Sequence, residues 1–199
     1  MKKISFCFVL LVCLKTSFSQ DNEGGFNMNK MFAGGTVVLG LGFGNNSQFT
    51  IGGNPELGYT IFETVDLGVC GNYIYSSASY LYTDGNTYKT NITLSGLGIF
   101  TRLHVSEGFF IQLQPEFNNI QYKESIKDRD YSREENFKSS SFLVGVGFGS
   151  RDVGRMNFFT TILIDLQKDK YSPYRTSTGE ISPVVRSGIN FYFGRKGRT

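Results

Sequence analysis

Apolar and polar side chains alternate along most of this chain. Within 48–61 the odd positions are mainly large and apolar, such as Ile51 and Leu57, whereas the even positions are small or polar, such as Thr50 and Glu56. Successive side chains of a β-strand point to opposite faces, so a period of two indicates a strand with one apolar and one polar face. The pattern predicts eight strands, at 35–43, 48–61, 66–76, 96–103, 109–117, 141–149, 157–166 and 185–193.

The connections between these strands alternate in length. Tight turns are expected at 63–65, 105–107 and 151–154, and long polar loops at 80–87, 123–138 and 168–182. The connection at 45–47 is short but falls on the side of the long loops. An even number of antiparallel strands, with short turns at one end and long loops at the other, is the layout of outer-membrane barrels. The predicted fold is therefore an all-β, eight-stranded, antiparallel up-and-down transmembrane barrel.

The polar face carries few charges and consists mainly of Gly, Ser, Thr, Asn and Gln. A soluble barrel would place many Lys and Glu residues on its water-facing side. Small residues with a few opposed charges suit the crowded interior of a narrow barrel, where an unpaired charge is costly. We therefore expect an ion-pair network in the lumen, with Arg186 paired with Glu56 or Glu116. Its expected members are Glu56, Arg102, Glu116, Asp165 and Arg186.

The apolar face has no charge within the eight strand cores. A lipid-facing Arg or Lys at the bilayer midplane would cost about 2–4 kcal/mol, so this absence is typical of a membrane barrel. Aromatic residues lie at the ends of the apolar faces, among them Tyr73, Tyr75, Phe148 and Phe193. They predict the girdles that mark the two membrane interfaces.

The N-terminus has the three regions of a secretory signal peptide. Lys2 and Lys3 precede the apolar stretch Ile4–Leu14, and small residues at Ser17 and Ser19 predict cleavage before Gln20. The expected organisation is a signal peptide (1–19), a flexible arm (20–31), the barrel (32–194) and a basic C-terminal tail (195–199).

Composition narrows the possible functions further. Without its signal peptide the chain has 17 basic and 17 acidic residues, and this neutrality argues against nucleic acid as a partner. Cys70 would be the sole remaining cysteine, which excludes an intramolecular disulfide and a cysteine-based metal site. The 24 Gly, 19 Phe and 11 Tyr residues favour strands over helices.

No motif in the chain predicts catalysis. The glycine runs at 40–44 and 145–149 lie inside alternating strands, whereas a phosphate loop opens a helix. His104 is the single histidine, and it lies beside a tight turn, where we expect it to be solvated rather than paired with a nucleophile. Glu116 and Asp165 could form an acid–base pair, but ion pairing with an arginine is favoured. We expect no enzyme activity, cofactor or metal.

Two stretches resemble the outer-membrane β-barrel domain family. Asn54-Pro55-Glu56-Leu57-Gly58-Tyr59, a tight turn and Val65-Asp66-Leu67-Gly68-Val69 are similar to a strand pair of its small eight-stranded bacterial members. The run 96–102 resembles the family's Gly-x-Phe-x-Arg strand. The resemblance implies an eight-stranded barrel with a periplasmic N-terminus and no catalytic residues. Many outer-membrane proteins end at an aromatic residue, whereas here Tyr192-Phe193 is followed by 194–199.

The chain is therefore expected in the outer membrane of a Gram-negative bacterium. Its expected partners are outer-membrane lipids and lipopolysaccharide, with the barrel-assembly machinery during biogenesis and no assigned protein partner. The leading interpretation is a structural or surface-interaction barrel with a plugged lumen. The alternatives are a narrow transport or small-ligand-binding barrel, or a lipid-modifying barrel enzyme. The charged stretch 123–138 is a solvated loop, an extension of the hairpin, or a contact surface for lipopolysaccharide or a partner.

Overall fold

Eight antiparallel strands form a closed barrel, as the alternation predicts. The computed structural model describes residues 27–42, 46–81, 87–126, 131–152, 156–175 and 180–193. Each strand pairs with the next along the chain, and β8 pairs with β1 to close the ring. The strands are β1 (Met31–Gly42), β2 (Asn46–Phe62), β3 (Val65–Leu81), β4 (Thr87–His104), β5 (Phe109–Ile126), β6 (Ser132–Gly149), β7 (Met156–Asp165) and β8 (Val184–Tyr192). The predicted all-β, eight-stranded, antiparallel up-and-down barrel is confirmed.

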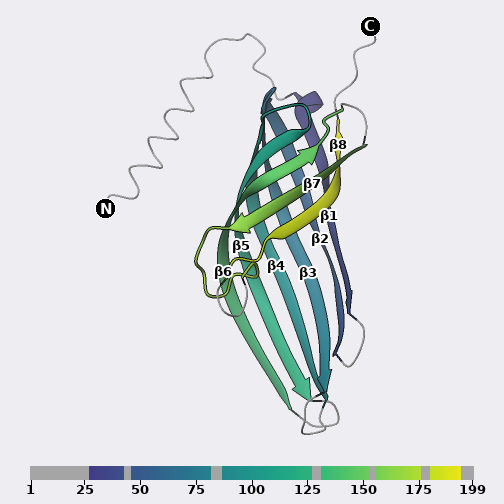
Figure 1. Ribbon diagram of the computed structural model, residues 1–199, viewed down its shortest axis with the longest axis vertical. Helices are drawn as coiled ribbons and strands as arrows, with labels where there is room; N and C mark the ends of the chain where they lie inside the picture. Colours follow the sequence, from purple (N-terminus) through teal and green to yellow (C-terminus); the bar gives the residue numbers. More distant parts are fainter. Residues whose placement is uncertain are drawn as a thin grey trace, which may run out of the picture.

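The wall of the barrel is uneven in height. β7 and β8 have 10 and 9 residues, whereas β2 to β6 have 17 or 18. In Figure 1 the long strands continue past β7 and β8 toward one end of the molecule. β6 pairs with β7 only from Leu143 onward, and β1 pairs with β8 only over Phe32–Thr36. The end with tight turns therefore has a complete wall, and the other end is a curved sheet of the longer strands.

Several strands extend into the stretches expected to be loops. β3 and β4 together leave only 82–86 between them, and the 123–138 stretch is mostly strand, which matches the hairpin-extension alternative. Outward positions in this part of β5 are polar, such as Asn119 and Gln121, so the apolar-face signal stops before the strand does. Backbone hydrogen bonds between strands require only a neighbouring strand. The strands therefore continue beyond the point where their outward side chains are apolar.

The two strand prolines are accommodated without a bulge. The β2–β3 ladder omits the pairs at Asn54 and Pro55 but has the same register on both sides of them. The β4–β5 ladder likewise omits the pairs at Gln114 and Pro115 without a shift of register. Proline lacks an N–H, so each ring costs ladder bonds without shifting the strand. On its other side Pro55 pairs with Gly35, whose φ is 150°. A Cβ at Gly35 would lie 2.5 Å from the carbonyl oxygen of Asn54, so this position requires glycine.

The last residues of the expected arm (20–31) have regular secondary structure. Met28–Lys30 form a short 3-10 helix, capped by the side chain of Asn27, and Met31 is already the first residue of β1. The expected signal peptide (1–19) and C-terminal tail (195–199) lie outside the described residues. No described helix is long and apolar enough to cross a membrane.

Apolar packing inside the barrel occurs in two small clusters. Phe32, Cys70, Phe100 and Tyr192 pack together, and Leu143, Leu163 and Tyr174 form the second cluster. Inward glycines make room for the rings, because a Cβ at Gly68 would lie 2.3 Å from the Phe100 ring. The rest of the interior is mainly polar and forms the candidate site.

Candidate functional site

The lumen holds the polar face of every strand, including all five charged residues expected in it from the sequence. Glu116 and Asp165 are 0% exposed, and Arg102 and Arg186 are 2% and 8% exposed. The side chain of Glu56 is 7% exposed. Charges this deeply buried require partners, since desolvation of each ion costs several kcal/mol.

Arg102 and Glu56 form a two-pronged ion pair. The Nη1 and Nη2 groups of Arg102 donate to Oε1 and Oε2 of Glu56, each at 2.8 Å, and Nε donates to Gln112 Oε1 at 2.9 Å. The guanidinium carbon also lies 4.6 Å and 4.7 Å from the ring centroids of Phe100 and Phe159. Parallel N–H···O bonds and flanking aromatic faces hold the guanidinium in one orientation.

A second ion pair crosses the lumen from β8 to β5. Arg186 Nη1 donates to Glu116 Oε1 at 3.0 Å, and Nη2 donates to the Tyr174 hydroxyl at 2.8 Å. That hydroxyl in turn donates to Glu116 Oε2 at 2.6 Å. Burial raises the pKa of Tyr174 well above its usual range, so the hydroxyl keeps the proton that it donates. Of the two partners expected for Arg186, the geometry selects Glu116.

Amide side chains join the two ion pairs along β5. Gln112 donates to Gln114, and Gln114 Nε2 donates to Glu116 Oε1 at 2.7 Å. Asn118 Nδ2 donates to Glu116 Oε2 at 3.2 Å and accepts from Asn72 Nδ2 at 3.0 Å. The hydrogen bonds therefore run from one ion pair to the other and on toward β3.

Asp165 has a different role from the one expected of it. Its carboxylate accepts from the backbone N–H groups of Phe142 and Gln167, each at 2.9 Å, and from the Ser172 hydroxyl at 2.5 Å. It makes no ion pair with any described residue. Asp165 instead satisfies a backbone donor of β6 just before the first residue that pairs with β7.

His104 is buried rather than solvated, which corrects the expectation for it. The residue is 7% exposed, and its Nε2 lies 2.9 Å from Oδ2 of Asp66, which is itself fully buried. Asp66 also accepts from Thr60 at 2.8 Å and from Arg151 at 3.3 Å. Arg151, which follows β6, also donates to the carbonyl oxygen of Glu63, so its side chain helps to enclose the pair at this end of the barrel.

Three buried polar residues of the lumen were not predicted from the sequence, for two different reasons. Asp66 and His104 have the same inward parity as Cys70 and Arg102 on their strands, so alternation could have placed them in the lumen. Tyr174 lies in the connection between β7 and β8, where no periodic pattern indicates which side chain enters the barrel. Its burial depends on how that connection folds.

The connection between β7 and β8 is fixed to the free part of β6. Asp169 Oδ2 accepts from the Ser140 N–H at 2.9 Å, and Oδ1 accepts from the Tyr171 N–H at 2.9 Å. The ring of Tyr171 stacks on Phe137 with centroids 4.7 Å apart. These backbone hydrogen bonds stabilise the carboxylate and lower the pKa of Asp169, and the bond from Ser140 has the largest effect. The segment thereby brings Tyr174 to the mouth of the lumen.

The buried polar groups of the lumen bond to one another and do not form a complete catalytic or metal site among the described residues. His104 and Asp66 resemble two members of a triad, but His104 Nδ1 has no hydrogen-bond partner, and a nucleophile hydroxyl would be required there. Within the described ranges no three His, Cys, Asp or Glu residues are grouped to hold a metal ion.

Comparisons with known proteins add a distant likeness. No protein-family model matches the chain. No curated protein matches it either. Among solved structures, the chain is similar to the crystal structure of the transport unit of the autotransporter AIDA-I from Escherichia coli. The TM-score is 0.42 at 13% sequence identity, over 92% of this chain and 67% of the other. A likeness at this level identifies neither family nor function.

Proposed function

We propose that this chain is a bacterial outer-membrane barrel with a structural or surface-interaction role, whose lumen is closed by its own side chains. The observation that carries the proposal is that the outer face of the barrel wall is apolar and the inner face is polar, the reverse of a soluble barrel. Large apolar side chains are exposed on the outside, whereas charged and amide side chains are buried inside. Every strand exposes at least one large apolar residue: Val37, Ile51, Val69, Leu97, Phe117, Val146, Phe158 and Val185.

The distribution of outward charge supports a membrane belt at the complete end of the wall. Within the described strands, charged side chains of outward parity occur only in β4, β5 and β6, in the parts that extend past β7. They are Lys89, Lys123, Glu134 and Lys138. β7 and β8 have the 9–11 residues that a tilted strand needs to cross a bilayer. The charged parts of the longer strands would then extend outside the cell.

The lumen network supports a closed barrel rather than a transport barrel. The Arg186–Glu116 pair joins β8 to β5 across the interior, and Tyr174 from the β7–β8 connection lies against it. An eight-stranded barrel encloses a space just wide enough for side chains. Opening a pore would therefore require breaking buried ion pairs. No observation favours the enzyme alternative, since the one His–Asp pair of the described residues has no hydroxyl at His104 Nδ1.

The test begins with cell fractionation and mass spectrometry of the mature chain, which we expect to start at Gln20. Refolded protein should insert into lipid vesicles and migrate differently on gels before and after boiling. In a planar bilayer it should give no reproducible single-channel steps. Recovery in the soluble periplasmic fraction would contradict the membrane assignment, and stable conductance would contradict the closed lumen.

A further inference from the structure

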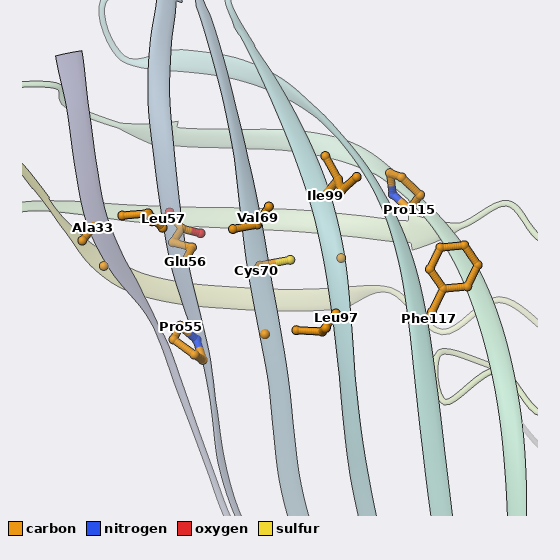
Figure 2. A pocket seen from close by; sticks show the side chains of 13 residues that line it. Ala33, Pro55, Glu56, Leu57, Val69, Cys70, Leu97, Ile99, Pro115 and Phe117 are labelled. Carbon is orange, nitrogen blue, oxygen red and sulfur yellow. The ribbon is translucent and has the colours of Figure 1, made fainter. Parts of the chain in front are cut away.

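The apolar outer face of the barrel is hollowed. A depression of about 820 Å³ spans β1 to β5, and its lining is almost entirely apolar. Figure 2 shows Pro55 on β2, Leu97 on β4 and Phe117 on β5 around it. Gly71 lies between them on β3 and contributes no side chain. A Cβ at Gly71 would contact only the Pro55 ring, at 3.4 Å, so the depression is open directly above this glycine.

A second depression, of about 870 Å³, adjoins the first toward the extended ends of the strands. The two share Leu97 and Phe117 as lining residues. The second reaches from Asn72 on β3 across to β6, and apart from the two shared residues its outward positions are polar. These polar positions are Ser95, Asn119, Lys138 and Ser140, joined by Asp169 from the β7–β8 connection.

The boundary between the two depressions is the edge of the apolar belt on β4 and β5 that lies nearer the extended strand ends. Leu97 and Phe117 are direct cross-strand partners in the last apolar row. In the next outward row Asn119 is the partner of both Ser95 and Lys138. If the chain spans a membrane as proposed above, the first depression faces acyl chains and the second lies at the level of the headgroups.

Lys138 is a free cation at that level. It is exposed and makes no hydrogen bond or ion pair with any described residue. The carboxylate of Asp169, which also lines this depression, accepts hydrogen bonds from the backbone N–H groups of Ser140 and Tyr171 and forms no ion pair with Lys138. An ammonium group at a headgroup level, flanked by hydroxyl and amide donors, is complementary to a phosphate.

We propose that the two depressions form one binding site for a phosphorylated membrane lipid on the outer wall. An acyl chain would lie in the apolar depression over Gly71, and the phosphate would contact Lys138, with Asn119 as an additional donor. This proposal rests on the proposed membrane location. It adds that the bound lipid is phosphorylated and that it lies in the leaflet next to the extended strand ends.

The phosphate half of the site is tested with two probes that differ only in the phosphate. Refolded protein in neutral detergent is titrated with dipalmitoyl phosphatidic acid or dipalmitoylglycerol, and bound lipid is counted by native mass spectrometry. Lys138→Gln should weaken binding of phosphatidic acid about fivefold and leave diacylglycerol unchanged. Lys123→Gln, which removes an outward cation further along β5, is the matched control and should change neither. Equal losses in the two variants would mean diffuse charge attraction and would overturn the site.

The acyl half is tested by filling the apolar depression from the outside. Gly71→Phe should weaken binding of both lipids at least about tenfold, because displacing two CH₂ groups already costs that much. Gly71→Ala, which leaves most of the space open, should bind like the wild type. Normal binding by Gly71→Phe would overturn the acyl position. Gel mobility before and after boiling and vesicle insertion, measured for each variant, separate loss of the site from failure of the membrane assignment.

Discussion

The Arg186–Glu116 pair offers the sharpest test of the lumen network. Arg186→Met removes one charge while keeping a long unbranched side chain. The variant loses the bonds to Glu116 at 3.0 Å and to the Tyr174 hydroxyl at 2.8 Å. The Glu116 carboxyl group would have three donors left: Tyr174 at 2.6 Å, Gln114 at 2.7 Å and Asn118 at 3.2 Å.

The expected loss of unfolding free energy follows from this inventory. Breaking a buried ion pair by removing one partner costs about 3–5 kcal/mol, because the other charge stays buried. The three remaining donors still solvate the Glu116 carboxylate, so we expect Arg186→Met to cost about 3 kcal/mol. Glu116→Gln alone should cost a similar amount, since it leaves the arginine unpaired. The double variant has no buried charge here and should recover about 1–2 kcal/mol relative to additivity.

The assay is urea unfolding of the refolded protein in detergent, followed by far-UV circular dichroism because the chain has no tryptophan. The control is Arg133→Met, which breaks the exposed pair with Glu135, whose side chains are 59% and 35% exposed. Such a pair contributes at most about 1 kcal/mol. Strictly additive losses in the double variant, or equal losses for Arg186→Met and Arg133→Met, would refute the reasoning.

Three further predictions concern topology, pH and packing. Protease added to intact cells should cut within 123–138 and not in the 105–108 turn; the reverse pattern would invert the barrel. The lowered pKa of Asp169 means that its carboxylate adds stability above the ordinary value of 3.8, and this contribution is lost as the pH falls through the folded value. The stability difference from Asp169→Asn, measured against pH, should shrink in that acidic range, and a constant difference would contradict it. Gly68→Ala, whose Cβ would lie 2.3 Å from a buried ring, should cost about 1–3 kcal/mol in urea unfolding, whereas outward Gly71→Ala should be nearly neutral.

The sequence by itself determined the number of strands, their order of pairing and which side chains face the lumen. The reason is local: strand side chains alternate strictly, so a single apolar position such as Leu57 assigns the opposite face to its neighbour Glu56. Short turns then allow only antiparallel neighbours, and eight such strands close into a ring. The same parity could also have placed Asp66 and His104 inside the barrel.

Only the tertiary structure decided which of the inward groups meet. The partner of Arg186 depends on the stagger between β8 and β5, which are separated by two strands, and no local pattern encodes that stagger. The lengths of β3 to β6 beyond the apolar belt were also undetermined, because backbone ladders continue where outward side chains no longer need to be apolar. The β7–β8 connection carries Tyr174 into the lumen through contacts with the free edge of β6, an edge that exists only because β7 is short.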